Sequence, residues 1–96
     1  MPIEQVYAAM QNEIDNLYKQ VIQADEQIRL YQTTTQNMEW EGTARNAIEG
    51  TLQEFRNDMV RLRTKIEAFM EEAGVSAEKM KQMSAQAILE LNSIKA

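Results

Sequence analysis

The stretch Thr33-Thr34-Thr35-Gln36-Asn37-Met38-Glu39-Trp40-Glu41-Gly42 decides the fold, because it separates two long segments whose apolar residues repeat at helical spacing. Thr is stiff at χ1, and its hydroxyl competes for backbone hydrogen bonds, so a preceding helix should fray here. Glu39 and Glu41 suit the positive end of a following helix, and Gly42 lets the backbone turn tightly. The sequence therefore predicts a bend at about residues 36–43.

A helix is expected before this bend, at about residues 3–35. Pro2 suits its first turn, and neither Gly nor Pro interrupts residues 3–32. Its main apolar face follows steps of three and four residues through Ile3, Val6, Met10, Ile14, Leu17, Val21, Ala24, Ile28 and Tyr31.

A second helix is expected after the bend, at about residues 44–73. Its apolar residues form a heptad-like seam through Ile48, Leu52, Phe55, Met59, Leu62, Ile66, Phe69 and Ala73. Gly50 interrupts this helix at a cost of about 1 kcal/mol relative to Ala, which packing can override. If Leu62 lies in the core, replacing it with Ala should cost on the order of 2 to 5 kcal/mol.

The remaining residues, about 76–96, are expected to form a helical tail. Gly74 is a suitable helix stop, and Ser76 suits the N-cap of a separate short helix. The seam nevertheless continues in phase through Met80, Met83, Ala87, Leu91 and Ile94, so a prolongation of the second helix is equally open. Met80 and Met83, beside Lys79 and Lys81, are the candidate lining of a groove for a partner, because Met repacks easily.

A single all-α domain follows from this pattern, since two helices joined by about ten residues pack as an antiparallel hairpin. Apolar residues also flank each stripe: Tyr7, Tyr18, Ile22, Leu30, Val60 and Met70. A stripe broader than a two-helix seam implies a further partner, most simply a second hairpin that completes a four-helix bundle. The residues expected in the core or in this dimer interface are Ile14, Leu17, Val21, Ile28, Ile48, Leu52, Phe55, Met59, Leu62, Ile66 and Phe69.

Composition argues against several functional classes. The 96 residues include no Cys and no His, which removes thiol nucleophiles, soft-metal sites and the usual acid/base group at neutral pH. Adjacent carboxylates such as Asp25-Glu26 point about 100° apart on a helix, and the glycines form no phosphate-binding loop, so we expect neither an enzyme nor a bound cofactor. The net charge of −5 repels nucleic acid and anionic membranes.

No segment reaches the roughly 18 to 20 continuous apolar residues that span a bilayer, and the N-terminal residues do not resemble a secretory signal. The sequence alone therefore predicts a protein that resides in the cytoplasm unless an export route without a cleaved signal exists.

The chain resembles the WXG hundred-residue family, the small ESAT-type substrates of type VII secretion systems. The resemblance is carried by Trp40-Glu41-Gly42 near mid-chain, by Ala44, by Phe55, and by helical arms on both sides. It covers residues 3–73. It implies a small protein without a cleaved signal that a type VII secretion ATPase exports as a folded dimer, with Trp40 and Gly42 at a turn that forms part of the export signal.

One feature of that family is missing here. Its members usually carry, in the C-terminal tail, a Tyr followed four residues later by an acidic residue, whereas residues 75–96 contain no Tyr. The resemblance therefore favours a hetero-complex over a self-sufficient homodimer. Three readings stay open: an exported dimeric binding module, a targeting companion for the helical N-terminal domain of a larger secreted toxin, and a cytoplasmic coiled-coil adaptor. A membrane-lytic helical protein is a more remote alternative.

Overall fold

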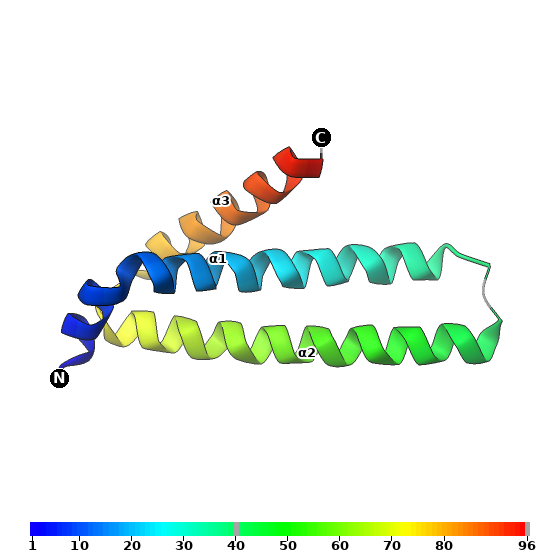
Figure 1. Ribbon diagram of the computed structural model, residues 1–96, viewed down its shortest axis with the longest axis horizontal. Helices are drawn as coiled ribbons and strands as arrows, with labels where there is room; N and C mark the ends of the chain where they lie inside the picture. Colours follow the sequence, from blue (N-terminus) through cyan, green and yellow to red (C-terminus); the bar gives the residue numbers. More distant parts are fainter. Residues whose placement is uncertain (40, 96) are drawn as a thin grey trace.

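The computed structural model describes residues 1–39 and 41–95 as three helices, with no strand among these residues. They are α1 (Ile3–Gln36), α2 (Gly42–Glu72) and α3 (Ala77–Lys95). The molecule is elongated, with extents of 53 × 29 × 19 Å. Helices α1 and α2 run antiparallel along its length, and α3 returns along α1 from the end where α2 finishes (Figure 1). The protein is thus all-α, and its helix limits lie within two residues of those expected from the sequence.

Helix α1 is bent near its N-terminus. Met10 has non-helical backbone angles (φ −118°, ψ 18°), and the first turns lean away from the rest of the helix (Figure 1). The Tyr7 hydroxyl donates a hydrogen bond of 2.8 Å to Asp15 Oδ1 across this bend. This contact ties the first turns to the body of α1.

The threonine run does not fray α1, contrary to expectation. Thr33, Thr34 and Thr35 each donate a hydroxyl hydrogen bond to the carbonyl four residues earlier, at 3.2, 3.0 and 2.8 Å. The hydroxyls therefore add hydrogen bonds to carbonyls within the helix and do not draw the backbone out of the helical conformation. The helix ends only at Gln36, and Asn37 N–H then bonds to the Thr34 carbonyl at 3.1 Å.

The role expected for Gly42 in a tight turn is not supported. Gly42 is the first residue of α2 and does not have positive φ, and a Cβ placed there would meet nothing within 4 Å. Glu41 precedes it with an extended backbone (ψ 144°), and its carbonyl accepts the Arg45 N–H at 2.9 Å. Extended backbone at Glu41, and not glycine flexibility, therefore starts the helix. Trp40 lies outside the described residues.

The connection between α2 and α3 depends on Gly74. This residue adopts φ +93°, the left-handed region that favours glycine. Gly74 N–H bonds to the Glu71 carbonyl at 3.0 Å, and Val75 N–H bonds to the Met70 carbonyl at 2.9 Å, which closes α2 with a Schellman-type end. Ser76 Oγ then accepts the Lys79 N–H at 3.1 Å and caps α3. The tail is thus a separate helix.

The core lies at the end of the molecule where all three helices meet. Its buried hydrophobic residues are Tyr7, Tyr18, Val21, Ile22, Ile66, Met70, Met80 and Ala87. Tyr18, Ile22 and Met70 are among the flanking residues that broadened the stripe and so implied a further partner. In the structure α3 of the same chain contributes Met80 and Ala87 to the cluster that includes these three residues.

Candidate partner-binding surface

An apolar groove runs between α1 and α2 on a face to which α3 contributes no residue. It has a volume of about 330 Å³. Its lining consists of Val6, Met10, Ile14 and Leu17 from α1 and Lys65, Ile66 and Phe69 from α2. Lys65 is the only charged side chain in this lining. The chemistry of the groove therefore suits an apolar side chain and not a polar small molecule.

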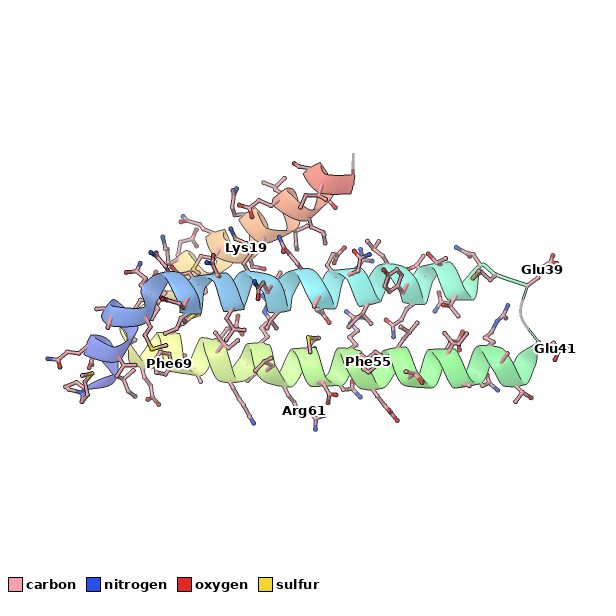
Figure 2. The ribbon with its side chains drawn as sticks, in the orientation of Figure 1. Lys19, Glu39, Glu41, Phe55, Arg61 and Phe69 are labelled. Carbon is pink, nitrogen blue, oxygen red and sulfur yellow. The ribbon has the colours of Figure 1, made fainter. Side chains whose placement is uncertain are left out.

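The apolar face continues beyond the groove toward the bend. Phe55 and Leu62 lie fourteen and seven residues before Phe69, so the heptad spacing places all three on one side of α2. Phe55 is 52% exposed and Leu62 is 38% exposed. On α1, Tyr31 lies fourteen residues after Leu17 and is also exposed. Figure 2 shows Phe55 and Phe69 along α2, with Arg61 on the outer edge of that helix. We call the set Met10, Leu17, Tyr31, Phe55, Leu62 and Phe69 the open face.

The residues expected in the core or interface fall into three groups. Val21 and Ile66 are buried. The half-buried members are Ile14, Ile28, Ile48, Leu52, Met59 and Phe69. Leu17, Phe55 and Leu62 are exposed, so in the single chain they are not core residues. The physical reason is that, among the described residues, this face is built from α1 and α2, and α3 does not line the groove there. An interface role for these residues stays a prediction.

The expected partner groove at Met80 and Met83 needs correction. Met80 is buried in the core, because α3 folds back onto the hairpin and uses this side chain to do so. Met83 is half-buried against the core and lines a groove between α1 and α3, where it is the one apolar residue of the lining, beside residues such as Asn16 and Gln82. Met80 is therefore occupied within the chain.

A polar cluster that the sequence did not single out joins all three helices. The Tyr18 hydroxyl donates to Glu67 Oε2 at 2.5 Å, and the Arg63 guanidinium lies 5.8 Å from the centre of the Tyr18 ring. Arg63 also donates to Glu67 Oε2 at 3.4 Å and to Ser84 Oγ at 3.3 Å. Burial, followed by the hydrogen bond to Glu67, raises the pKa of Tyr18 to about 12. The only signal in the sequence was the position of Tyr18 beside the apolar stripe.

Two further contacts fasten α3 to α1. Lys19 Nζ lies 2.8 Å from Glu90 Oε2, and Gln23 Nε2 donates to the Ala87 carbonyl at 2.9 Å. The hydrogen bond from Lys19 lowers the pKa of the Glu90 carboxyl. These contacts stop at Glu90, and beyond them Ile94 is exposed as α3 diverges from α1 (Figure 1).

The described part of the chain contains no cluster of three or more His, Cys, Asp or Glu residues that could hold a metal ion. Among the same residues, no helix combines the length and the apolar character that crossing a membrane requires. No protein-family model matches this sequence, and no curated protein or solved structure matches it either.

Proposed function

We propose that this protein is a helical binding module that pairs through its open face with a second helical protein and is exported with it by a type VII secretion system. The observation that carries the pairing is the open face itself. Six large apolar side chains lie on one face of a two-helix layer, and five of them are exposed although the same chain buries a core where its three helices meet. A contiguous apolar surface of this kind is typical of a protein–protein interface.

The chemistry of the face supports a helical partner. Its residues are spaced by seven or fourteen positions on both helices, which matches the spacing that an amphipathic helix presents in return. A single hairpin cannot cover its own broad apolar stripe, and two hairpins that meet through their open faces bury both stripes. Aromatic side chains and Met, which are enriched at interfaces, make up four of the six members.

The export route rests on the resemblance to the WXG family. Trp40-Glu41-Gly42 lies between the two arms, as in that family. Because residues 75–96 contain no Tyr, the tail part of the export signal would come from the partner. The partner is then a related small helical protein, or the helical N-terminal domain of a larger secreted protein, and the type VII ATPase recognises the pair.

Leu62→Glu tests the pairing, because it places a charge in the middle of the open face at a residue that is already 38% exposed. Val60→Glu is the matched control. Val60 is 50% exposed and lies two residues away, so it points about 200° from Leu62 around the helix. Tagged chains would be purified from the native cell and the mass of each complex measured. The partner should be lost with Leu62→Glu and retained with Val60→Glu. If both variants retain the partner equally, the open face is not the binding surface.

Fractionation of culture supernatants from strains with and without the type VII ATPase tests the export step. The protein should reach the medium only when the ATPase is present. Trp40→Ala should strongly reduce the amount of protein in the medium while it lowers the melting temperature only slightly. If the protein stays inside the cell in both strains, the export proposal fails and a companion or adaptor role is left.

A further inference from the structure

Helix α3 is attached to the rest of the molecule by an interface that is separate from the open face. On the hairpin side this interface includes Tyr18, Ile22 and Met70, which are almost fully buried. On the α3 side it includes Met80 and Ala87. Three polar contacts surround these apolar residues: Lys19 to Glu90, Gln23 to the Ala87 carbonyl, and Arg63 to Ser84. Both sides of the interface therefore match each other in apolar character and in polar contacts.

The connection that brings α3 to this interface is short and depends on one backbone conformation. Only residues 73–76 lie outside α2 and α3. Within them, Gly74 alone has positive φ, at +93°. A non-glycine residue in the left-handed region is disfavoured by its Cβ. The reversal of the chain is thus concentrated at a single residue.

The sequence also supports a straight connection. The apolar repeat of α2 reaches Ala73, and seven residues later Met80 continues it in phase, followed by Ala87 and Ile94. A helix that ran unbroken from α2 into α3 would present one continuous apolar stripe. In that arrangement Met80 and Ala87 would leave their own hairpin, and the surface formed by Tyr18, Ile22 and Met70 would be uncovered.

From these observations we propose that α3 is an exchangeable arm, and that two copies of this chain form a domain-swapped dimer in which the α3 of each copy docks on α1 of the other. The occupant of the uncovered surface is fixed by the structure, because the α3 of a second copy carries the same Met80, Ala87 and Glu90. No new contact is needed, since each exchanged arm remakes the contacts of the closed chain. Only the conformation of residues 73–76 changes.

The exchange is independent of the proposed function. It uses the surface of the hairpin that α3 covers, and so leaves both open faces of the dimer free for other partners. The dimer would therefore present two open faces instead of one. In the wild-type chain the closed form is favoured at low concentration, because a tethered α3 has a high effective concentration at its own hairpin.

Gly74→Ala is the first arm of the test. It makes positive φ costly and favours helix, and the added Cβ meets nothing within 4 Å. Gly74→Asn is the matched control, because Asn tolerates the left-handed region. Gly50→Ala controls for helix propensity alone, since it adds the same methyl group within α2 where nothing lies within 4 Å. In the swapped dimer, residue 74 of each of the two chains no longer needs positive φ, and removing this cost changes the dimerisation constant roughly tenfold per chain. Gly74→Ala should therefore dimerise on the order of 100-fold more tightly than Gly74→Asn.

Isotope mixing identifies which dimer has formed. Equal amounts of ¹⁴N-labelled and ¹⁵N-labelled full-length chains would be unfolded together in urea, refolded, and treated with a carbodiimide. The reagent activates the Glu90 carboxyl, and the Lys19 amine, 2.8 Å away in the closed chain, displaces the activating group to form an amide. Mass spectrometry of the linked peptides then shows whether Lys19 and Glu90 came from one chain or from two.

The swapped dimer predicts that half of the Lys19–Glu90 links in Gly74→Ala carry mixed labels, and that Leu62→Glu added to Gly74→Ala changes neither the links nor the dimer. Gly74→Asn and Gly50→Ala should give links within one label at the same concentration. Links confined to one label in Gly74→Ala overturn the proposal, whether that variant is monomeric or dimeric. A dimer that Leu62→Glu abolishes would belong to the open face and would also overturn it.

Discussion

The two ends of this molecule are built from the same two helices but differ in how completely their apolar residues are buried. At the end near Gly74, α3 covers the hairpin, and Tyr18 and Met70 have no exposed surface. Toward the bend, α1 and α2 alone pack together among the described residues, and Phe55 remains 52% exposed although it occupies the same heptad-like seam as the buried Ile66. The difference shows that periodicity alone does not bury a residue, because a two-helix layer covers only one side of each stripe.

The largest effect should come from Met70→Ala, which removes a fully buried side chain at the three-helix end. The free energy of unfolding should fall by about 2 to 5 kcal/mol, since three packed helices limit the collapse of the cavity. Met59→Ala is the matched change at a half-buried position of the same helix and should cost clearly less. Urea unfolding followed by circular dichroism measures both. Equal losses would mean that the degree of burial does not set the cost of truncation along α2, which would contradict the comparison.

Tyr18→Phe should have the next largest effect, because it removes one hydroxyl from the polar cluster and leaves the ring in place. The lost hydrogen bond, 2.5 Å to Glu67 Oε2, has a charged acceptor. Such bonds contribute about 1.5 to 3 kcal/mol, and the partly exposed Glu67 carboxylate recovers some of this from water, so about 1 to 2 kcal/mol should be lost. Tyr31→Phe, at an exposed position near the bend, is the control and should leave the unfolding midpoint unchanged. A loss below the error of the measurement would show that the cluster does not stabilise α3.

Alkaline pH should weaken the same end of the molecule. Burial and the contact with Glu67 raise the pKa of Tyr18 from 10.0 to about 12. Burial and the hydrogen bond to Asp15 raise the pKa of Tyr7 to about the same value. The folded state therefore holds these protons more tightly than the unfolded state, so the stabilisation is complete below pH 10 and is lost as the pH rises from 10 through 12. Unfolding midpoints measured across this range should fall in the wild type and fall less in a chain carrying Tyr7→Phe and Tyr18→Phe. Parallel pH profiles for the two chains would refute the assignment.

The helices could be predicted from the sequence because their apolar residues recur at unbroken helical spacing, and Gly74 and Ser76 are recognisable as stop and cap. The path of α3 was not predictable in the same way. The same apolar phase from Ala73 to Met80 fits both a straight and a reversed connection, and long-range contacts such as Gln23 to the Ala87 carbonyl accompany the reversed one. Local pattern carries no information about such contacts.

The open face shows a second limit of the pattern. A seven-residue repeat drifts about 20° per heptad around a straight helix, so it does not decide which flank of the stripe meets the neighbouring helix. In α2 the flank with Ile66 and Met70 became core, and the flank with Phe55 and Leu62 became surface. Ile66, Phe55 and Leu62 all belong to one seam in the sequence, which is why a core role was expected for Leu62.

Leu62→Ala should therefore have the smallest effect on the single chain. The side chain is 38% exposed, so its truncation removes only part of the burial energy of a leucine and leaves no closed cavity, and about 1 kcal/mol or less should be lost. The comparison becomes sharper when unfolding is repeated at increasing protein concentration with the partner present. If a second helical molecule covers the open face, the same substitution should then cost more, because the stability of the complex includes the interface. A cost of 2 kcal/mol or more in the isolated monomer would mean instead that Leu62 is packed within one chain, and that the open face is better buried than two helices allow.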